Sequence, residues 1–162
     1  MKSIANFILV LGQSNAMTYT TIGVGYPGGW TQPGLGGGFS DVIWNVAAQT
    51  WQAYTPGTNS DQPGGSSAWG PEARIAVRKR ALVPQRATYI LKYAAGGLGL
   101  AKSANTDWSP YSDNETWMAF GAQLEASIAG LASVRSVVID ECYWIGNETD
   151  TLVEADAVAI MR

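Results

Sequence analysis

The chain has 162 residues, the length of a single domain, and 46% of its side chains are hydrophobic while only 14% are charged. An average soluble domain carries roughly 25% charged residues, so this composition predicts a packed core and argues against a disordered chain. Ten basic and thirteen acidic side chains give a net charge of -3. Nucleic acid is therefore not an expected partner.

The sequence also disfavours a membrane-spanning protein and a disulfide-stabilised protein. The longest apolar runs, residues 7–11 and 137–139, fall far below the roughly 20 residues needed to cross a bilayer, so we expect no membrane partner. The first six residues lead directly into a strand-like segment and do not predict a signal peptide, which leaves the compartment open. The single Cys142 cannot form an internal disulfide, and metal sites built on paired cysteines are excluded; we expect no cofactor.

The expected elements alternate between strands and helices. Residues 6–11 form a continuous apolar run that ends at Gly12, the pattern of a strand buried on both faces of a parallel sheet. Pro71 opens an expected helix from about 71 to 82, and residues 88–93 form a second strand. The later elements are a helix over about 115–131, whose apolar residues include Trp117 and Phe120, a strand over 135–144 and a helix over 152–161.

This order predicts an α/β fold with a mostly parallel sheet, whose ligands bind beyond the carboxyl ends of the strands. Residues 20–67 interrupt the alternation with glycine-rich and turn-rich sequence, and we expect a surface insertion in one domain that spans residues 1–162. Within it, residues 42–46 and 50–54 predict a small hairpin. Trp117 and Trp144 are expected in the core. Two tryptophans of the hairpin could anchor the insertion or stack on a sugar: Trp44 and Trp51.

The turn after the first strand carries the strongest chemical signal. The glycine of Gly12-Gln13-Ser14-Asn15-Ala16 permits a tight turn, and the serine stands at the start of a following helix. A serine there could act as a nucleophile beside backbone N–H groups that stabilise an oxyanion. Serine and asparagine are also common helix N-caps, so a purely structural interpretation stays open at this point.

Four segments in order resemble one family. Residues 12–15, Gly-Gln-Ser-Asn, resemble the nucleophile block of the sialate O-acetylesterase-type carbohydrate esterases, a branch of the SGNH (GDSL-like) hydrolases. Residues 69–72, Trp-Gly-Pro-Glu, are similar to the family's Gly-Pro-Glu helix start. Residues 92–98 are similar to a block that usually ends Gly-Gly-Thr, with Leu98 in place of the threonine. Residues 144–150 are similar to Trp-x-Gln-Gly-Glu-x-Asp.

The resemblance implies a flavodoxin-like three-layer sandwich of SGNH type and the hydrolysis of acetyl esters on carbohydrates. Ser14 would attack the ester carbonyl. The backbone N–H groups of Ser14 and Gly97 would be oxyanion donors, with Gly96 as the alternative to Gly97. Gln13 and Asn15 belong to the same block as supporting residues.

The third oxyanion donor departs from the family's pattern. The family's glutamine falls on Gly146, which has no side chain, and Asn147 follows it. A small shift of the backbone would let Asn147 supply the amide. Glu148 and Asp150 match the acids of that block, and we expect them to hold loops or cap a helix.

The catalytic base is the largest departure. The chain contains no histidine, and the resemblance implies that it stops before the family's Asp-x-x-His block. One hypothesis is an esterase module whose C-terminal segment lies on another chain or is missing from this sequence, so that Ser14 is placed but not activated. A second is a non-catalytic relative that binds acetylated glycans or serves a structural role. A third uses another base. The candidates are Lys92, Lys102, Glu148 and Asp150.

Two further expectations concern surfaces. Asp140 and Glu141 are neighbours on a strand and should point to opposite faces, so their region predicts a solvated surface rather than a cation site. A sheet that lacks an edge segment leaves an open edge, which predicts self-association into a homo-oligomer or pairing with a complementing chain.

Overall fold

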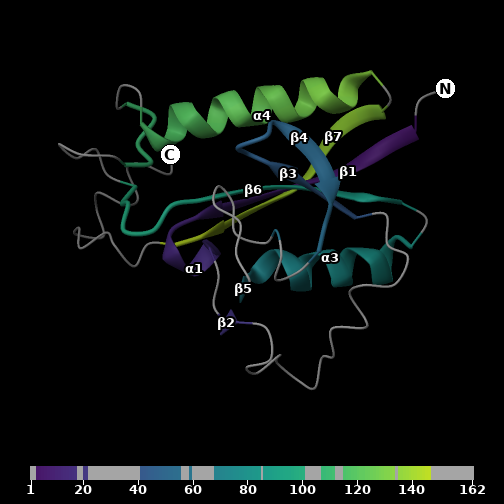
Figure 1. Ribbon diagram of the computed structural model, residues 1–162, viewed down its shortest axis with the longest axis horizontal. Helices are drawn as coiled ribbons and strands as arrows, with labels where there is room; N and C mark the ends of the chain where they lie inside the picture. The colour runs from purple at the N-terminus through teal and green to yellow at the C-terminus, as the bar shows by residue number, and fades with distance from the viewer. Residues whose placement is uncertain are drawn as a thin grey trace.

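A computed structural model describes residues 3–17, 20–21, 41–55, 59, 68–84, 86–100, 107–111, 115–133 and 135–146. In this part of the chain the main feature is a five-stranded sheet with the order β4-β3-β6-β1-β7 (Figure 1). Its strands are β1 (Ser3–Gly12), β3 (Val42–Asn45), β4 (Thr50–Ala53), β6 (Thr88–Ala94) and β7 (Arg135–Ile145). The other elements are the two-stranded pair β2 (Thr20–Thr21) and β5 (Ala68–Trp69), and the helices α1 (Ser14–Met17), α3 (Pro71–Leu82) and α4 (Thr116–Ala132).

The sheet is mostly parallel. β1 pairs in parallel with both β6 and β7, and β3 pairs in parallel with β6; only β4 runs antiparallel to its neighbour β3. β1 lies between the two later strands β6 and β7, which α4 connects. The chain therefore crosses from one side of β1 to the other, and the carboxyl end of β1 lies at this reversal.

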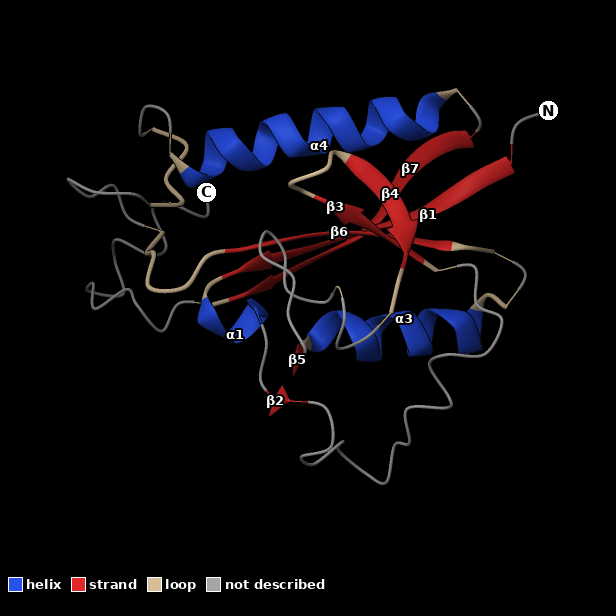
Figure 2. Cartoon of the chain, viewed as in Figure 1, coloured by secondary structure: helices blue, strands red, loops and turns tan. Residues whose placement is uncertain are grey.

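Helices cover both faces of the sheet. α4 lies along one face, and α1 and α3 lie on the other (Figure 2). β1 alternates between the two layers: Phe7 and Leu9 join the core under α4, whereas Ile8 and Val10 join the core under α3. All four are buried, as expected for a central strand. The expected α/β architecture is confirmed as a three-layer arrangement.

The predicted hairpin is present, but it does not belong to a separate surface insertion. β3 continues the main sheet through its parallel pairing with β6, and β4 forms the edge. The indole of Trp44 donates to Gln123 Oε1 (2.8 Å), and that of Trp51 donates to the carbonyl of Ser127 (3.0 Å), both on α4. These two tryptophans therefore pack into the main core beneath α4.

The helices expected at about 71–82 and 115–131 match α3 and α4 closely. Trp144 packs against the core as expected, but the expectation for Trp117 was wrong, since 41% of this residue is exposed. It lies in the first turn of α4, where it contacts Phe120 at the margin of the core. The helix expected at 152–161 lies outside the described residues. None of the described helices has the length and hydrophobicity to span a membrane.

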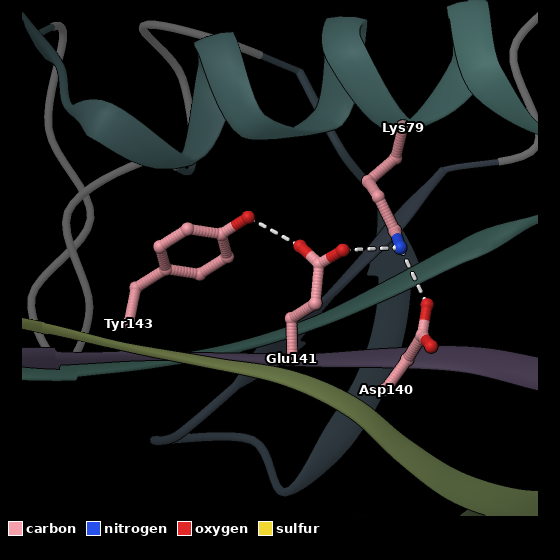
Figure 3. A network of polar contacts seen from close by, with 4 residues as sticks. All are labelled: Lys79, Asp140, Glu141 and Tyr143. Carbon is pink, nitrogen blue, oxygen red and sulfur yellow. Dashed lines mark hydrogen bonds and ion pairs between the residues drawn. The ribbon is translucent and has the colours of Figure 1, made fainter.

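A break in register corrects the expectation for Asp140 and Glu141. Ile139 pairs with Phe7 and Glu141 with Ile8, so Asp140 is an extra residue in β7. This bulge turns both carboxylates toward Lys79 of α3, whose Nζ lies 2.5 Å from Asp140 and 2.6 Å from Glu141 (Figure 3). The pair thus ties the edge strand to a helix instead of facing two sides of the sheet.

This network predicts a loss of stability in acid. Hydrogen bonds from Lys79 and Tyr143 hold the pKa of Glu141 below its ordinary value of 4.5. A carboxyl group whose pKa is lower in the folded than in the unfolded state stabilises the fold at pH values above its unfolded-state pKa. That contribution is lost as the pH falls through its folded-state pKa. We expect the wild type to be more stable than Glu141→Gln at pH 7, and the difference to shrink below about pH 4.5.

Urea unfolding at a series of pH values measures that difference. Burial alone would lower the pKa of Lys79, but its hydrogen bonds to Asp140 and Glu141 raise it above 10.5, so the ammonium stays charged throughout this range. A stability difference that stayed constant down to pH 2 would contradict the role given to Glu141.

Candidate active site

Three strand ends meet at one edge of the sheet. In the pairing of the strands, Gly12 at the end of β1 lies opposite Ala94 of β6 on one side and Ile145 of β7 on the other. The Gly12 carbonyl accepts a hydrogen bond from the Ala95 N–H (3.0 Å), and the Gln13 N–H donates to the Ile145 carbonyl (3.0 Å). The turn after β1 is therefore held on both sides, at the place where parallel α/β sheets bind ligands.

Gly12 is required by the shape of this turn. Its φ of 143° is a conformation that side chains with a Cβ rarely adopt. A Cβ added there would collide with the carbonyl oxygen of Ile145 and lie 2.7 Å from its carbonyl carbon. The glycine thus lets β1 pass directly against the end of β7 before α1 begins at Ser14.

Gln13 joins the two neighbouring loops and is completely buried. Its side-chain amide donates to the Leu98 carbonyl in the loop after β6. A Cβ added to Gly146, after β7, would lie 3.1 Å from Cγ and Oε1 of Gln13, so the backbone at 146 packs against this side chain. The sequence marked Gln13 only as a supporting residue, and the structure places it at the centre of the three loops.

Ser14 is the first residue of α1, and the structure describes Ser14 and Asn15 by their backbone. The Ala16 N–H bonds the Gln13 carbonyl (2.9 Å), which closes the single turn. Across from it, Gly97 has a φ of 75° and no atom within 4 Å of the position that a Cβ would take. Gly96 and Gly97 thus lie in the loop that Gln13 contacts through Leu98, and that loop leaves open space at Gly97.

A buried ion pair lies under the same turn. Glu72 of α3 and Lys92 of β6 are both fully buried, with Oε2 and Nζ 2.9 Å apart. Lys92 also donates to the carbonyl of Met17, the last residue of α1. The other carboxylate oxygen of Glu72 accepts hydrogen bonds from the Gly70 N–H (3.0 Å) and from the Tyr54 hydroxyl (3.1 Å).

The roles of Glu72 and Lys92 differ from those expected from the sequence. Lys92 was a candidate for the missing base, but its Nζ donates to a carbonyl and faces a carboxylate, so it serves as a buried donor. Glu72 belonged to a matching motif without a role. The two residues are 20 positions apart, and no periodicity brings them together. The one available signal was a charged residue within the β-rich run of residues 88–93.

The remaining candidates are not brought together by the described structure. Lys102, Asn147, Glu148 and Asp150 lie outside the described residues. Within the described ranges, no group of three or more acidic or cysteine side chains is arranged to hold a metal ion.

The comparisons with known proteins support the fold. No family model matches the sequence, and no curated protein matches it. Among solved structures, the chain is similar to a protein from Arabidopsis thaliana, with a TM-score of 0.61 and 16% identity over 97% of this chain and 62% of that chain. It is also similar to NanS, with a TM-score of 0.58 and 13% identity over 94% of this chain and 57% of that one.

At these identities the similarity concerns the fold alone. The chain spans about three fifths of the length of both solved structures.

Proposed function

We propose that the chain is a serine esterase domain of SGNH type, which removes acetyl groups from carbohydrates through an acyl intermediate on Ser14. The carrying observation is the convergence of three strand ends on Gln13, which brings the start of α1 and the loop at Gly97 to one edge. A nucleophile needs backbone donors close to the ester oxygen, and we assign that role to N–H groups of both segments. The fold similarity to NanS is consistent with the proposal.

The proposed reaction begins with attack by the Ser14 hydroxyl oxygen on the ester carbonyl carbon. The new bond places negative charge on the carbonyl oxygen, which the N–H groups of Ser14 and Gly97 stabilise, with the Asn147 amide as a third donor. A base takes the serine proton, and the bond to the sugar oxygen breaks as that oxygen is protonated. Water then releases acetate from Ser14 and restores the hydroxyl.

The chain contains no histidine and Lys92 is held in the buried ion pair, which favours a base from outside this sequence over the other candidates Lys102, Glu148 and Asp150. We propose that a segment carrying aspartate and histidine completes the site. The alternative function is a non-catalytic module that binds acetylated glycans, and the missing histidine is the observation that favours it.

Turnover of p-nitrophenyl acetate separates the two functions. Free imidazole at millimolar concentration serves as the missing base, and Ser14→Ala supplies the background rate, because imidazole also cleaves this ester in water. We expect the wild type plus imidazole to exceed Ser14→Ala plus imidazole, by less than the roughly 100-fold or more that a positioned base contributes, because free imidazole is not held in the site. Equal rates for the two proteins would refute the esterase function and leave the binding module.

A further inference from the structure

A buried ion pair such as that between Glu72 and Lys92 often adds no net stability over a well-packed apolar pair. Removing two charges from water costs several kcal/mol per ion, and well-packed apolar side chains often replace such pairs without loss. Both residues are 0% exposed. What the pair supplies is a fixed geometry among the groups that it contacts.

Those groups belong to three elements around the candidate site. Lys92 lies on β6, where it pairs with Val10 two residues before the end of β1. Glu72 lies in the first turn of α3, and Lys92 reaches across to the Met17 carbonyl at the end of α1. The strand β6 and the helices α3 and α1 therefore meet at the ammonium group of Lys92.

Gly70 shows how closely these groups pack. A Cβ added to it would lie 2.5 Å from Glu72 Oε2, 2.6 Å from the Met17 carbonyl oxygen and 2.8 Å from Lys92 Nζ. The backbone of Gly70, just before α3, thus packs directly against the ion pair and against the end of α1, and only glycine leaves room for both.

α1 needs such an external support. It has four residues, a single turn, and helices of this length are not stable by themselves in water. Its first end is held through Gln13 and Ile145, and its last carbonyl is held by Lys92. Ser14 and Met17 are three residues apart, about 4.5 Å along a helix axis, so a shift at Met17 is transmitted to Ser14.

We propose that Glu72 and Lys92 are positioning residues, whose buried ion pair fixes α1 and thereby the placement of Ser14. The proposed effect on turnover rests on the esterase function given above, whereas the effect on α1 itself does not. Breaking the pair should loosen α1 before the rest of the fold and lower kcat without changing KM.

Hydrogen exchange of single backbone amides in the full chain tests the structural part. The Ala16 N–H reports on α1, and the Ile90 N–H, in the centre of β6, reports on opening of the whole sheet. In Lys92→Met we expect the exchange rate at Ala16 to rise about tenfold more than the rate at Ile90, because the equilibrium constant for local opening of α1 rises by that factor. Glu72→Gln is the second variant, since it removes the charge of the other partner and keeps an acceptor for Gly70.

Lys79→Met is the matched control. Like Lys92, Lys79 is a buried lysine that forms ion pairs on the side of the sheet covered by α3, but its partners lie on β7 and not beside α1. We expect it to accelerate Ala16 and Ile90 equally. Equal acceleration in Lys92→Met and Glu72→Gln as well would overturn the proposal, since the pair would then be an ordinary contributor to stability.

Turnover with imidazole tests the catalytic part. We expect kcat of Lys92→Met to fall to near the Ser14→Ala background at constant KM, because a misplacement of 1 Å can cost about 100-fold, while Lys79→Met retains its kcat. Unchanged kcat in Lys92→Met with a loosened α1 would contradict the positioning role. If the wild type lacks turnover and α1 still loosens, the esterase function fails and the structural role of the pair stands.

Discussion

Gly12→Ala is expected to destabilise the fold by at least about 3 kcal/mol. The added methyl group would strain the backbone and would collide with main-chain atoms, which cannot rotate away as a flexible side chain could. Residues with a Cβ rarely adopt a φ of 143°, and the atoms in the way of the added Cβ are the carbonyl oxygen and carbon of Ile145. To make room, β1 and β7 must separate at the candidate site. Urea unfolding followed by tryptophan fluorescence measures the loss.

Gly121→Ala is the matched control for this prediction. Gly121 lies inside α4, and nothing lies within 4 Å of the position of its added Cβ. There we expect a gain of about 1 kcal/mol, since alanine is the better helix former. A Gly12→Ala protein as stable as the wild type would show that the ends of β1 and β7 do not meet as described.

Lys92→Met is expected to cost about 3–5 kcal/mol in the free energy of unfolding, because it leaves the Glu72 carboxylate charged and buried without its partner. The double variant Glu72→Gln/Lys92→Met removes both charges and keeps an oxygen that can accept from Gly70 and Tyr54. It should therefore be more stable than Lys92→Met alone, with a coupling of about 2 kcal/mol between the two sites.

The same urea experiments on the four proteins of this cycle measure the coupling. Additive losses would mean that Glu72 and Lys92 do not interact, against their separation of 2.9 Å. The network at Lys79 offers a comparison, because the side chains of Asp140 and Glu141 are 43% and 34% exposed. Solvent weakens that network, so the same cycle with Glu141 should give a smaller coupling.

Local patterns predicted the central elements of the fold. The apolar run before Gly12 predicted a strand buried on both faces, because an amphipathic strand would alternate. Pro71 predicted the start of α3, since proline fits the first turn of a helix and lacks the N–H that later turns require. The strand endings at Gly12 and after Ala94 then located the candidate site at one edge of the sheet.

Features that depend on distant contacts could not be predicted in this way. The hairpin joins the main sheet because Val42 pairs with Tyr89, and no local pattern encodes that partner. The bulge at Asp140 reverses the alternation of β7, so an argument from two-residue periodicity assigns the wrong face. The pair of Glu72 and Lys92 exists only because α3 crosses β6 near the end of α1.

The identity of the acylated residue tests the central claim most directly. The wild type is incubated briefly with p-nitrophenyl acetate and imidazole, quenched in acid and analysed by peptide mapping in a mass spectrometer. The account predicts an acetyl group on Ser14 that appears within the first turnover and is lost on further incubation. Acetylation that is spread over surface lysines and other serines, with Ser14 unmodified, would contradict it.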